Sequence, residues 1–228
     1  MEGGLYYTPN QTQQTYNIED INFEYCQEGW ERCAFPEDLY FDDEPLRHVT
    51  SLDDVESGKW FFDYEADRIY FADDPIDHSL ETSVTNIAFN DISNNVTIQN
   101  LIIEKFASSI GHGAVGYNGS SGWIVEGNEI RLNHGNGIVV GSNSVVRENY
   151  IHHNGNFGIE AGAVEGISRV SNILYEANEI SYNNYAHVMM IFGGGGTKFT
   201  LSDDIRVIGN YVHHNLGIGL WTDIINNN

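Results

Sequence analysis

The chain has few basic residues. Of its 228 residues, 10 are Lys or Arg and 33 are Asp or Glu, which gives a formal net charge of −23 at pH 7. Proteins that bind nucleic acid hold the phosphates with Lys and Arg, so this balance argues against a nucleic-acid partner. It argues equally against binding to an anionic membrane surface. We expect an acidic protein that stays dispersed and acts as a monomer.

Long apolar runs are also absent. No stretch reaches the roughly 18 apolar residues of a membrane-spanning helix, so we expect no membrane span. The first residues, Met1–Gly4, include neither a basic region nor an apolar one. A secretory signal peptide needs both, so none is visible at this end of the chain.

Cysteine is scarce too. The two cysteines, Cys26 and Cys33, are separated by six residues, a spacing that suits a small loop closed by a disulfide. Two free thiols fit the sequence equally well. No further cysteine and no nearby histidine cluster completes a zinc site.

The second half of the chain contains a repeat. Its pattern is Asn, any residue, Ile or Val, two of any residue, Asn. The copies begin at Asn128, Asn149, Asn178 and Asn210, at intervals of 21, 29 and 32 residues. A degenerate earlier copy begins at Val96, with Leu101 in the first Asn position. β-Branched stretches precede the copies and glycines interrupt them, which indicates short strands rather than helices. Such a unit buries its apolar face only by stacking on its neighbours, so the repeat predicts a β-solenoid.

The repeated asparagines have an architectural explanation. Asparagine tolerates the left-handed backbone conformation of a tight turn, and amides at the same turn of successive coils can bond to one another as a ladder. We therefore expect all eight to support the fold rather than act on a ligand: Asn128, Asn133, Asn149, Asn154, Asn178, Asn183, Asn210 and Asn215.

Repeats of this form resemble the right-handed parallel β-helix of the pectin-lyase-like superfamily. The closer resemblance is to bacterial right-handed β-helix-region proteins of unassigned activity. The matching segments are residues 36–40, 58–60, 69–71, 112–115, 195–199, 210–213 and 219–223. The resemblance implies an all-β, right-handed parallel β-helix. It also implies a polysaccharide or cell-surface glycan as partner, outside the cell or at its surface.

Residues 1–90 lack the repeat and are rich in aromatic and acidic residues. We expect an N-terminal β-rich region that caps the open end of the solenoid, with a hairpin loop at residues 63–67, and we assign residues 91–228 to the coils. The chain stops at residues 224–228, within the turn of another coil, so we expect further coils to follow and the N-terminus to be incomplete.

Side chains on the strand after each second Asn should alternate between the core and the exterior. The inward column predicted by this alternation is Ile138, Ile159, Val188 and Leu220. By the same register we expect Val115 and Tyr117 to face outward. The outward face then carries Tyr117, Glu160, Trp221 and Asp223. Aromatic rings stack on sugars and carboxylates accept hydroxyl hydrogen bonds, so we expect substrate binding by Trp221, Glu160 and Tyr117, with an ordinary mixed surface as the alternative.

Two chemistries are considered for this face. Glu160 and Asp223 are expected roughly 12 Å apart in backbone position, whereas glycosidase carboxylates lie about 5 to 9.5 Å apart, so the pair suits hydrolysis poorly. Lys198 follows a flexible run of four glycines, and an amine can remove the proton beside a uronate carboxylate in β-elimination. We expect Lys198 and Asp223 to act in a shared groove. An exposed lysine on an insertion loop is the alternative.

Two histidines are weaker candidates for acid–base catalysis, His112 and His134. Gly111–His112–Gly113 resembles the Gly-His-Gly of polygalacturonases. The remaining parts of that signature are missing, so polygalacturonase activity is not carried over.

Acidic clusters occur at residues 42–44, 73–74 and 203–204. Calcium prefers such oxygen ligands, and it would offset the repulsion between an acidic protein and a uronate polymer. No EF-hand spacing is present, and solvated turn carboxylates are the default explanation. Calcium is therefore the candidate cofactor.

These observations predict a polysaccharide-acting protein, with a lyase favoured over a hydrolase. A non-catalytic glycan-binding or cell-surface module is the main alternative, and a purely structural solenoid is another.

Overall fold

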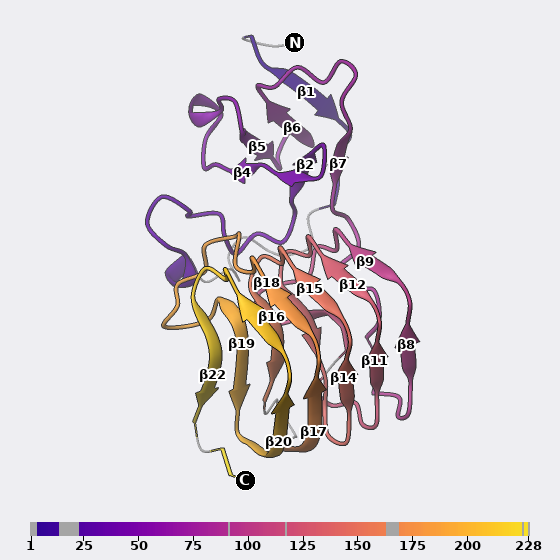
Figure 1. The fold of residues 1–228 in the computed structure, drawn as a ribbon. Coiled ribbons are helices and arrows are strands. Elements are labelled where there is room, and N and C mark those ends of the chain that lie inside the picture. The colour runs from indigo at the N-terminus through magenta and orange to yellow at the C-terminus, as the bar shows by residue number, and fades with distance from the viewer. Residues whose placement is uncertain are drawn as a thin grey trace.

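The computed structural model describes residues 4–13, 23–90, 92–116, 118–162, 169–224 and 226–227. Figure 1 shows an N-terminal β-rich region lying against a stack of coils. Helical structure is confined, in the described residues, to two 3-10 turns, η2 (Phe23–Tyr25) and η3 (Leu52–Asp54). The predicted all-β class is confirmed.

Five coils build three parallel sheets, and each coil gives one strand to each sheet. The first sheet contains β8 (Thr97–Gln99), β11 (Ile124–Glu126), β14 (Val145–Arg147), β17 (Val170–Glu176) and β20 (Ser202–Ile208). The second contains β9 (Ile102–Glu104), β12 (Glu129–Arg131), β15 (Tyr150–His152), β18 (Glu179–Ser181) and β21 (Tyr211–His213). The third contains β10 (Gly113–Val115), β13 (Asn136–Val139), β16 (Phe157–Ala161), β19 (Gly195–Thr200) and β22 (Ile218–Asp223).

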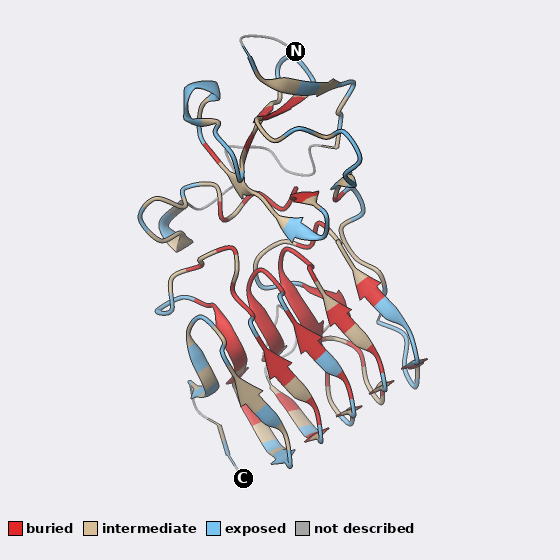
Figure 2. Ribbon diagram, turned by 45° about the horizontal axis from the view of Figure 1, so that its top comes forward, coloured by how far each residue is buried: buried red, intermediate tan, exposed pale blue. Residues whose placement is uncertain are grey.

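The core is a set of apolar columns that run through the coils. The aliphatic position of the repeat forms one column through the second sheet: Ile103, Ile130, Ile151, Ile180 and Val212. The first four of these are at most 4% exposed, and Figure 2 shows the middle coils as the most buried part of the stack. Burying such a side chain contributes roughly 1.5–3 kcal/mol, which no coil obtains alone because its apolar partners lie in the coils on either side.

Two asparagine ladders flank the second sheet, as predicted. In the first, Asn128 Nδ2 donates to Asn149 Oδ1 at 3.0 Å, and the ladder continues through Asn178 to Asn210. In the second, amide-to-amide bonds of 2.9 Å link Asn133, Asn154, Asn183 and Asn215.

The left-handed turn position is the residue before each ladder asparagine, not the asparagine itself. Those positions are Gly127, Leu132, Glu148, His153, Ala177, Tyr182, Gly209 and His214, with φ between 49° and 64°. The ladder bonds therefore hold non-glycine residues in a conformation that they adopt rarely.

The N-terminal region forms two small sheets. One has the order β1 (Tyr6–Pro9), β6 (Arg68–Phe71), β5 (Lys59–Asp63) and β4 (Arg47–His48). The other has the order β3 (Glu44–Pro45), β2 (Leu39–Phe41) and β7 (Leu80–Thr82). Strands β5 and β6 pair in antiparallel register across residues 63–67, so the predicted hairpin is confirmed.

This region lies along the side of the solenoid, against the turns that follow the second asparagine of the repeat (Figure 1). Tyr40 Oη donates to Leu132 O at 2.6 Å, and Tyr185 Oη donates to Asp38 Oδ2 at 2.6 Å. Lys105 pairs with Asp43 at 2.5 Å. We expected a cap over the open end, but these contacts cover turns of the first, second and fourth coils. The physical reason is that those turns carry buried polar groups that need partners from outside the coil.

Cys26 and Cys33 form a disulfide, with their Cα atoms 5.5 Å apart. The structure therefore has the disulfide-closed loop and not two free thiols, the two alternatives that the sequence left open. The loop that it closes packs on Ala186 and Val188 of the fourth coil, and Cys26 and Val188 form an isolated β-bridge. Across the described ranges, no helix is long and apolar enough to cross a membrane.

Candidate functional site

Three predicted residues lie next to one another on the outer face of the third sheet. The register aligns Glu160 with Lys198 and Lys198 with Trp221, on β16, β19 and β22. Asp223 lies two residues beyond Trp221 and is aligned with Thr200. Side chains on one face of a parallel sheet are neighbours at about 4.8 Å between strands, so the four residues form one surface group, here called the Lys198 cluster.

Lys198 is the centre of this cluster. Its Nζ donates to Phe192 O at 3.2 Å, lies 3.5 Å from Asp223 Oδ2, and lies 4.2 Å from the centroid of the Trp221 ring. The lysine side chain is only 13% exposed and that of Asp223 is 33% exposed. The carbonyl, the carboxylate and the aromatic face are all partners of an ammonium group. Lys198 is therefore on a strand, with its amine engaged, and is not an exposed lysine on an insertion loop.

Glu160 extends the cluster onto the neighbouring strand. Asn136 Nδ2 donates to Glu160 Oε2 at 2.5 Å. Burial raises the pKa of Glu160 above its ordinary value, and the Asn136 hydrogen bond and the Lys198 charge oppose that rise. The protonated form of Glu160 is consequently favoured more than in a solvated glutamate, which suits a proton donor.

The two carboxylates of the cluster are not on adjacent strands. Glu160 is on β16 and Asp223 is on β22, with β19 between them, and their register positions differ by two residues. Two strand spacings and two residues correspond to a backbone separation of roughly 12 Å. This separation is longer than the about 5 to 9.5 Å between the two catalytic carboxyl groups of glycosidases, as expected from the sequence.

The register corrects two predictions about this face. Thr197, not Val188, occupies the inward column with Ile159 and Leu220. The reason is that the fourth coil makes an excursion, residues 182–194, between β18 of the second sheet and β19 of the third sheet, which begins only at Gly195. Val115 is aligned with Ile138 and is fully buried in the core, so it does not face outward as predicted. The other residue placed outward with it, Tyr117, lies outside the described residues.

The excursion of the fourth coil supplies a part of the site that the sequence did not reveal. Met190, Ile191 and Phe192 are 53%, 75% and 45% exposed, and the Phe192 ring packs edge-on against Tyr25 with the centroids 5.0 Å apart. Because the disulfide loop fixes Val188, it also fixes the segment whose carbonyl accepts the Lys198 hydrogen bond. The available signal in the sequence was the apolar run Met189–Met190–Ile191. Its pattern fits a strand of the third sheet as well as a segment that leaves that sheet.

The two histidine candidates lie in different places. His112 is exposed in the turn before β10, and its carbonyl accepts the hydrogen bond of Asn136 N–H. The adjacent Gly111 lines a hollow that Phe192 also lines. Strand β10 lies three strands from β19 in the third sheet, so His112 is not part of the Lys198 cluster.

His134 is not on the outer face. It is 2% exposed, and its ring nitrogens lie 3.0 Å from Asp38 Oδ2 and 2.9 Å from Cys33 O. Burial disfavours the imidazolium, but the Asp38 carboxylate and the Cys33 carbonyl outweigh burial and raise the pKa of His134. His134 joins the N-terminal region to the solenoid, so the structure places it apart from the other candidates.

The acidic clusters bind protein groups. Asp42 accepts from Ser79 N–H and pairs with His78, Asp73 accepts from Ser57 and Gly58, and Asp203 pairs with Arg169. Within the described part of the chain, no group of three or more His, Cys, Asp or Glu side chains is arranged to hold a metal ion.

A family model described as "Right handed beta helix region" matches residues 113–228, just over half of the chain. The chain therefore belongs to the right-handed β-helix family. No curated protein matches it. A solved structure, "The complex structure of XylC with xylose", superposes with a TM-score of 0.70 at 15% identity. The superposition covers 100% of this chain and 49% of that one, so this chain spans about half the length of XylC. At this identity the likeness shows the fold alone.

Proposed function

We propose that the chain is the β-helical part of a carbohydrate-acting protein and that a polysaccharide lies across the outer face of the third sheet. The observation that carries this proposal is the Lys198 cluster, in which an amine, an indole ring and two carboxylates occupy neighbouring positions on a rigid sheet. Sites on strands hold side chains more accurately than sites on loops. The fold of the family and the xylose complex of the similar XylC structure support a sugar ligand.

For the reaction, we favour β-elimination on a uronate-containing polymer over hydrolysis. Hydrolysis needs two carboxyl groups about 5 to 9.5 Å apart, and Glu160 and Asp223 are on strands that are not neighbours. Elimination needs a base that removes the proton beside the uronate carboxylate, an acid that protonates the leaving oxygen, and a cation at the carboxylate. Lys198 acts as the free amine, takes the proton and becomes an ammonium group beside Asp223 at 3.5 Å, while Glu160, with its raised pKa, gives its proton to the leaving oxygen. A calcium ion would supply the cation.

A second candidate is a glycan-binding module without catalysis. The observation in its favour is that the Lys198 amine already has three partners, among them Asp223 at 3.5 Å. In this case Trp221 and the carboxylates bind the sugar, and Lys198 only orients them.

We place the site of action outside the cell or at its surface. The Cys26–Cys33 disulfide supports this location, because disulfides persist in oxidising compartments and are rare in the cytosol. Calcium remains the candidate cofactor, since a divalent cation would offset the repulsion between a uronate polymer and a chain with a net charge of −23.

The test is turnover of acidic and neutral polysaccharides by the chain, with and without added calcium. Ultraviolet absorbance reports unsaturated uronate, and new reducing ends report hydrolysis. We expect absorbance that is lost in Lys198→Ala and kept in Lys59→Ala, whose lysine pairs with Glu56 in the N-terminal region. Reducing ends without absorbance would replace elimination by hydrolysis. Retention of a polysaccharide without any turnover would support the binding module.

A further inference from the structure

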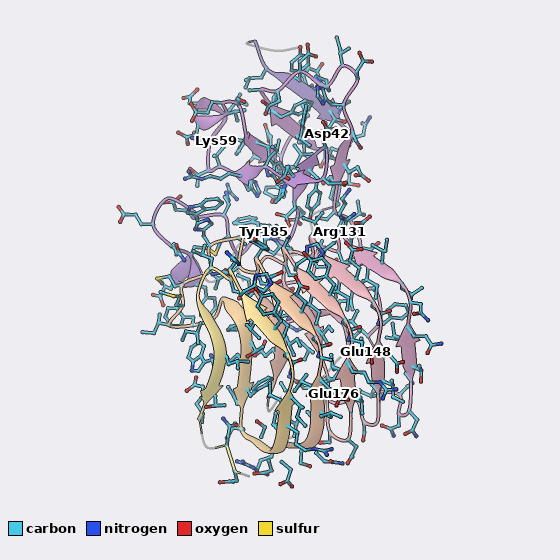
Figure 3. The ribbon with its side chains drawn as sticks, viewed as in Figure 1. Asp42, Lys59, Arg131, Glu148, Glu176 and Tyr185 are labelled. Atoms are coloured by element: carbon cyan, nitrogen blue, oxygen red, sulfur yellow. A yellow bond between two sulfur atoms is a disulfide. The ribbon has the colours of Figure 1, made fainter. Side chains whose placement is uncertain are left out.

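A second site is formed where the N-terminal region meets the turns of the coils, the junction marked by Tyr185 in Figure 3. A cavity of about 270 Å³ lies there. Its lining comes from both parts of the molecule and includes Trp30, Arg32, Arg47, His48, His134 and His187. These residues belong to the N-terminal region, the second coil and the excursion of the fourth coil, and none is part of the Lys198 cluster.

The cavity concentrates positive charge in an acidic protein. In the described part of the chain, carboxylates pair with Lys59, Lys105, Arg131, Arg147, Arg169 and Lys198. Arg32 and Arg47 have no such ion pair within the described residues. Their guanidinium groups lie instead over aromatic rings, Arg32 at 4.2 Å from the Phe35 centroid and Arg47 at 4.9 Å from the Trp30 centroid. Glu37 acts on Arg32 and Glu56 acts on Arg47 only through longer-range attraction, so both guanidinium groups keep donors that can bind an anionic ligand.

Several polar atoms in this wall also lack a protein partner. Among the described residues, both ring nitrogens of His48 and Nε of Arg47 are buried without a hydrogen bond. Buried polar groups are nearly always hydrogen-bonded, so three such atoms on the two neighbouring residues of this wall indicate that the cavity binds a polar ligand. His48 is held in place by stacking on Trp60, with the ring centroids 4.0 Å apart.

The carboxylate that lines the cavity is already compensated. Asp38 Oδ2 accepts from Tyr185 Oη at 2.6 Å and from Tyr40 Oη at 3.3 Å, and it lies 3.0 Å from His134 Nδ1. Burial, the Arg32 charge and His134 lower the pKa of His48 well below its ordinary value. Its neutral ring therefore retains one donor and one acceptor for a ligand.

We propose that this cavity binds a small anionic ligand whose carboxylate or phosphate oxygens are held by Arg32 and Arg47, with a hydrogen bond from His48. Arginine is suited to such oxyanions because its planar guanidinium presents several donors to two oxygens at once. Pockets for drug-sized molecules measure roughly 300–1,000 Å³, so a cavity of about 270 Å³ fits a ligand of about one sugar ring. The site is separate from the outer face, and the proposal does not depend on the proposed function.

The first test is calorimetric titration of the whole chain with D-glucuronate, D-glucose 6-phosphate and D-glucose. We expect at least one of the two anions to bind ten-fold or more tightly than glucose, and the stronger of the two identifies the group as carboxylate or phosphate. Arg47→Gln should weaken that binding at least ten-fold, Arg47→Lys should weaken it less, and Arg32→Gln should also weaken it. The matched control is Arg206→Gln, which removes an exposed arginine that also has no ion pair within the described residues, and it should leave the binding unchanged.

A measurement on the unaltered chain covers variants that fail to fold. The imidazole resonances of His48 and His134 should shift on addition of the anion, and those of the exposed His112 should not. Equal binding of anions and glucose, or undiminished binding in folded Arg32→Gln and Arg47→Gln variants, would overturn the proposal. Binding that leaves the His48 resonances unmoved would overturn it as well.

Discussion

The second asparagine ladder allows the effect of one substitution on stability to be predicted. In Asn154→Ala the fold loses a fully buried amide that makes five hydrogen bonds. Asn154 Oδ1 accepts from the N–H and the Nδ2 of Asn133, and Asn154 Nδ2 donates to Ile130 O, His152 O and Asn183 Oδ1. A buried polar group left without its partner costs roughly 1–3 kcal/mol. Asn133 loses two hydrogen bonds in the variant, and Ile130 O, His152 O and Asn183 Oδ1 lose one each. We expect a loss of about 3 kcal/mol in the free energy of unfolding.

The assay is chemical denaturation followed by circular dichroism, with the midpoint and slope compared between variants. The matched control is Asn94→Ala, which removes the side chain of an exposed asparagine that is outside the ladders and does not have a positive φ. Exposed substitutions of this kind change stability by less than about 0.5 kcal/mol. A midpoint for Asn154→Ala as close to the parent as that of Asn94→Ala would refute the view that the ladder holds the coils together.

Three further predictions follow from other parts of the fold. Replacing Cys26 and Cys33 by serine should lower the free energy of unfolding by roughly 2.5 kcal/mol, which is the loop-closure value for so short a loop. Chemical denaturation measures this change, and an unchanged midpoint would contradict it. Because the pKa of His134 is raised, its pairing with Asp38 stabilises the fold fully below pH 6.5, and this contribution is lost as the pH rises through the folded-state pKa. Denaturation across that range should therefore show a decline that His134→Asn removes, and a decline that persists in the variant would contradict the assignment. Because burial raises the pKa of Glu160, the protonated side chain contributes stability that is fully present below pH 4.5 and is lost as the pH rises through the folded-state pKa. Glu160→Gln should remove this loss of stability with rising pH. Identical profiles of stability against pH for the variant and the parent would contradict the raised pKa.

The repeated half of the fold was predictable because each coil repeats the same local rule. The aliphatic position of the repeat gave the column from Ile103 to Val212, and the asparagines gave both ladders. The left-handed position was misplaced by one residue. Asparagine is the common left-handed residue, but here its amide is committed to the next coil and the residue before it makes the turn.

The parts that could not be predicted depend on contacts between distant segments. The docking of the N-terminal region rests on Asp38 meeting His134 and Tyr185, which are 96 and 147 residues away. Val188 has the parity of an inward residue, but the disulfide loop recruits it to a separate apolar cluster. The strand of that coil therefore begins at Gly195, and this shift is what places Lys198 between Glu160 and Trp221.

Binding of a polysaccharide panel to the parent chain, Trp221→Ala and Tyr211→Ala tests the central claim most directly. Trp221 is in the Lys198 cluster on the third sheet, and Tyr211 is a 62% exposed aromatic residue on β21 of the second sheet. If the outer face of the third sheet contacts the glycan, Trp221→Ala loses at least ten-fold in affinity and Tyr211→Ala keeps the affinity of the parent. Equal affinities for all three proteins, or a loss confined to Tyr211→Ala, would contradict the assignment of that face.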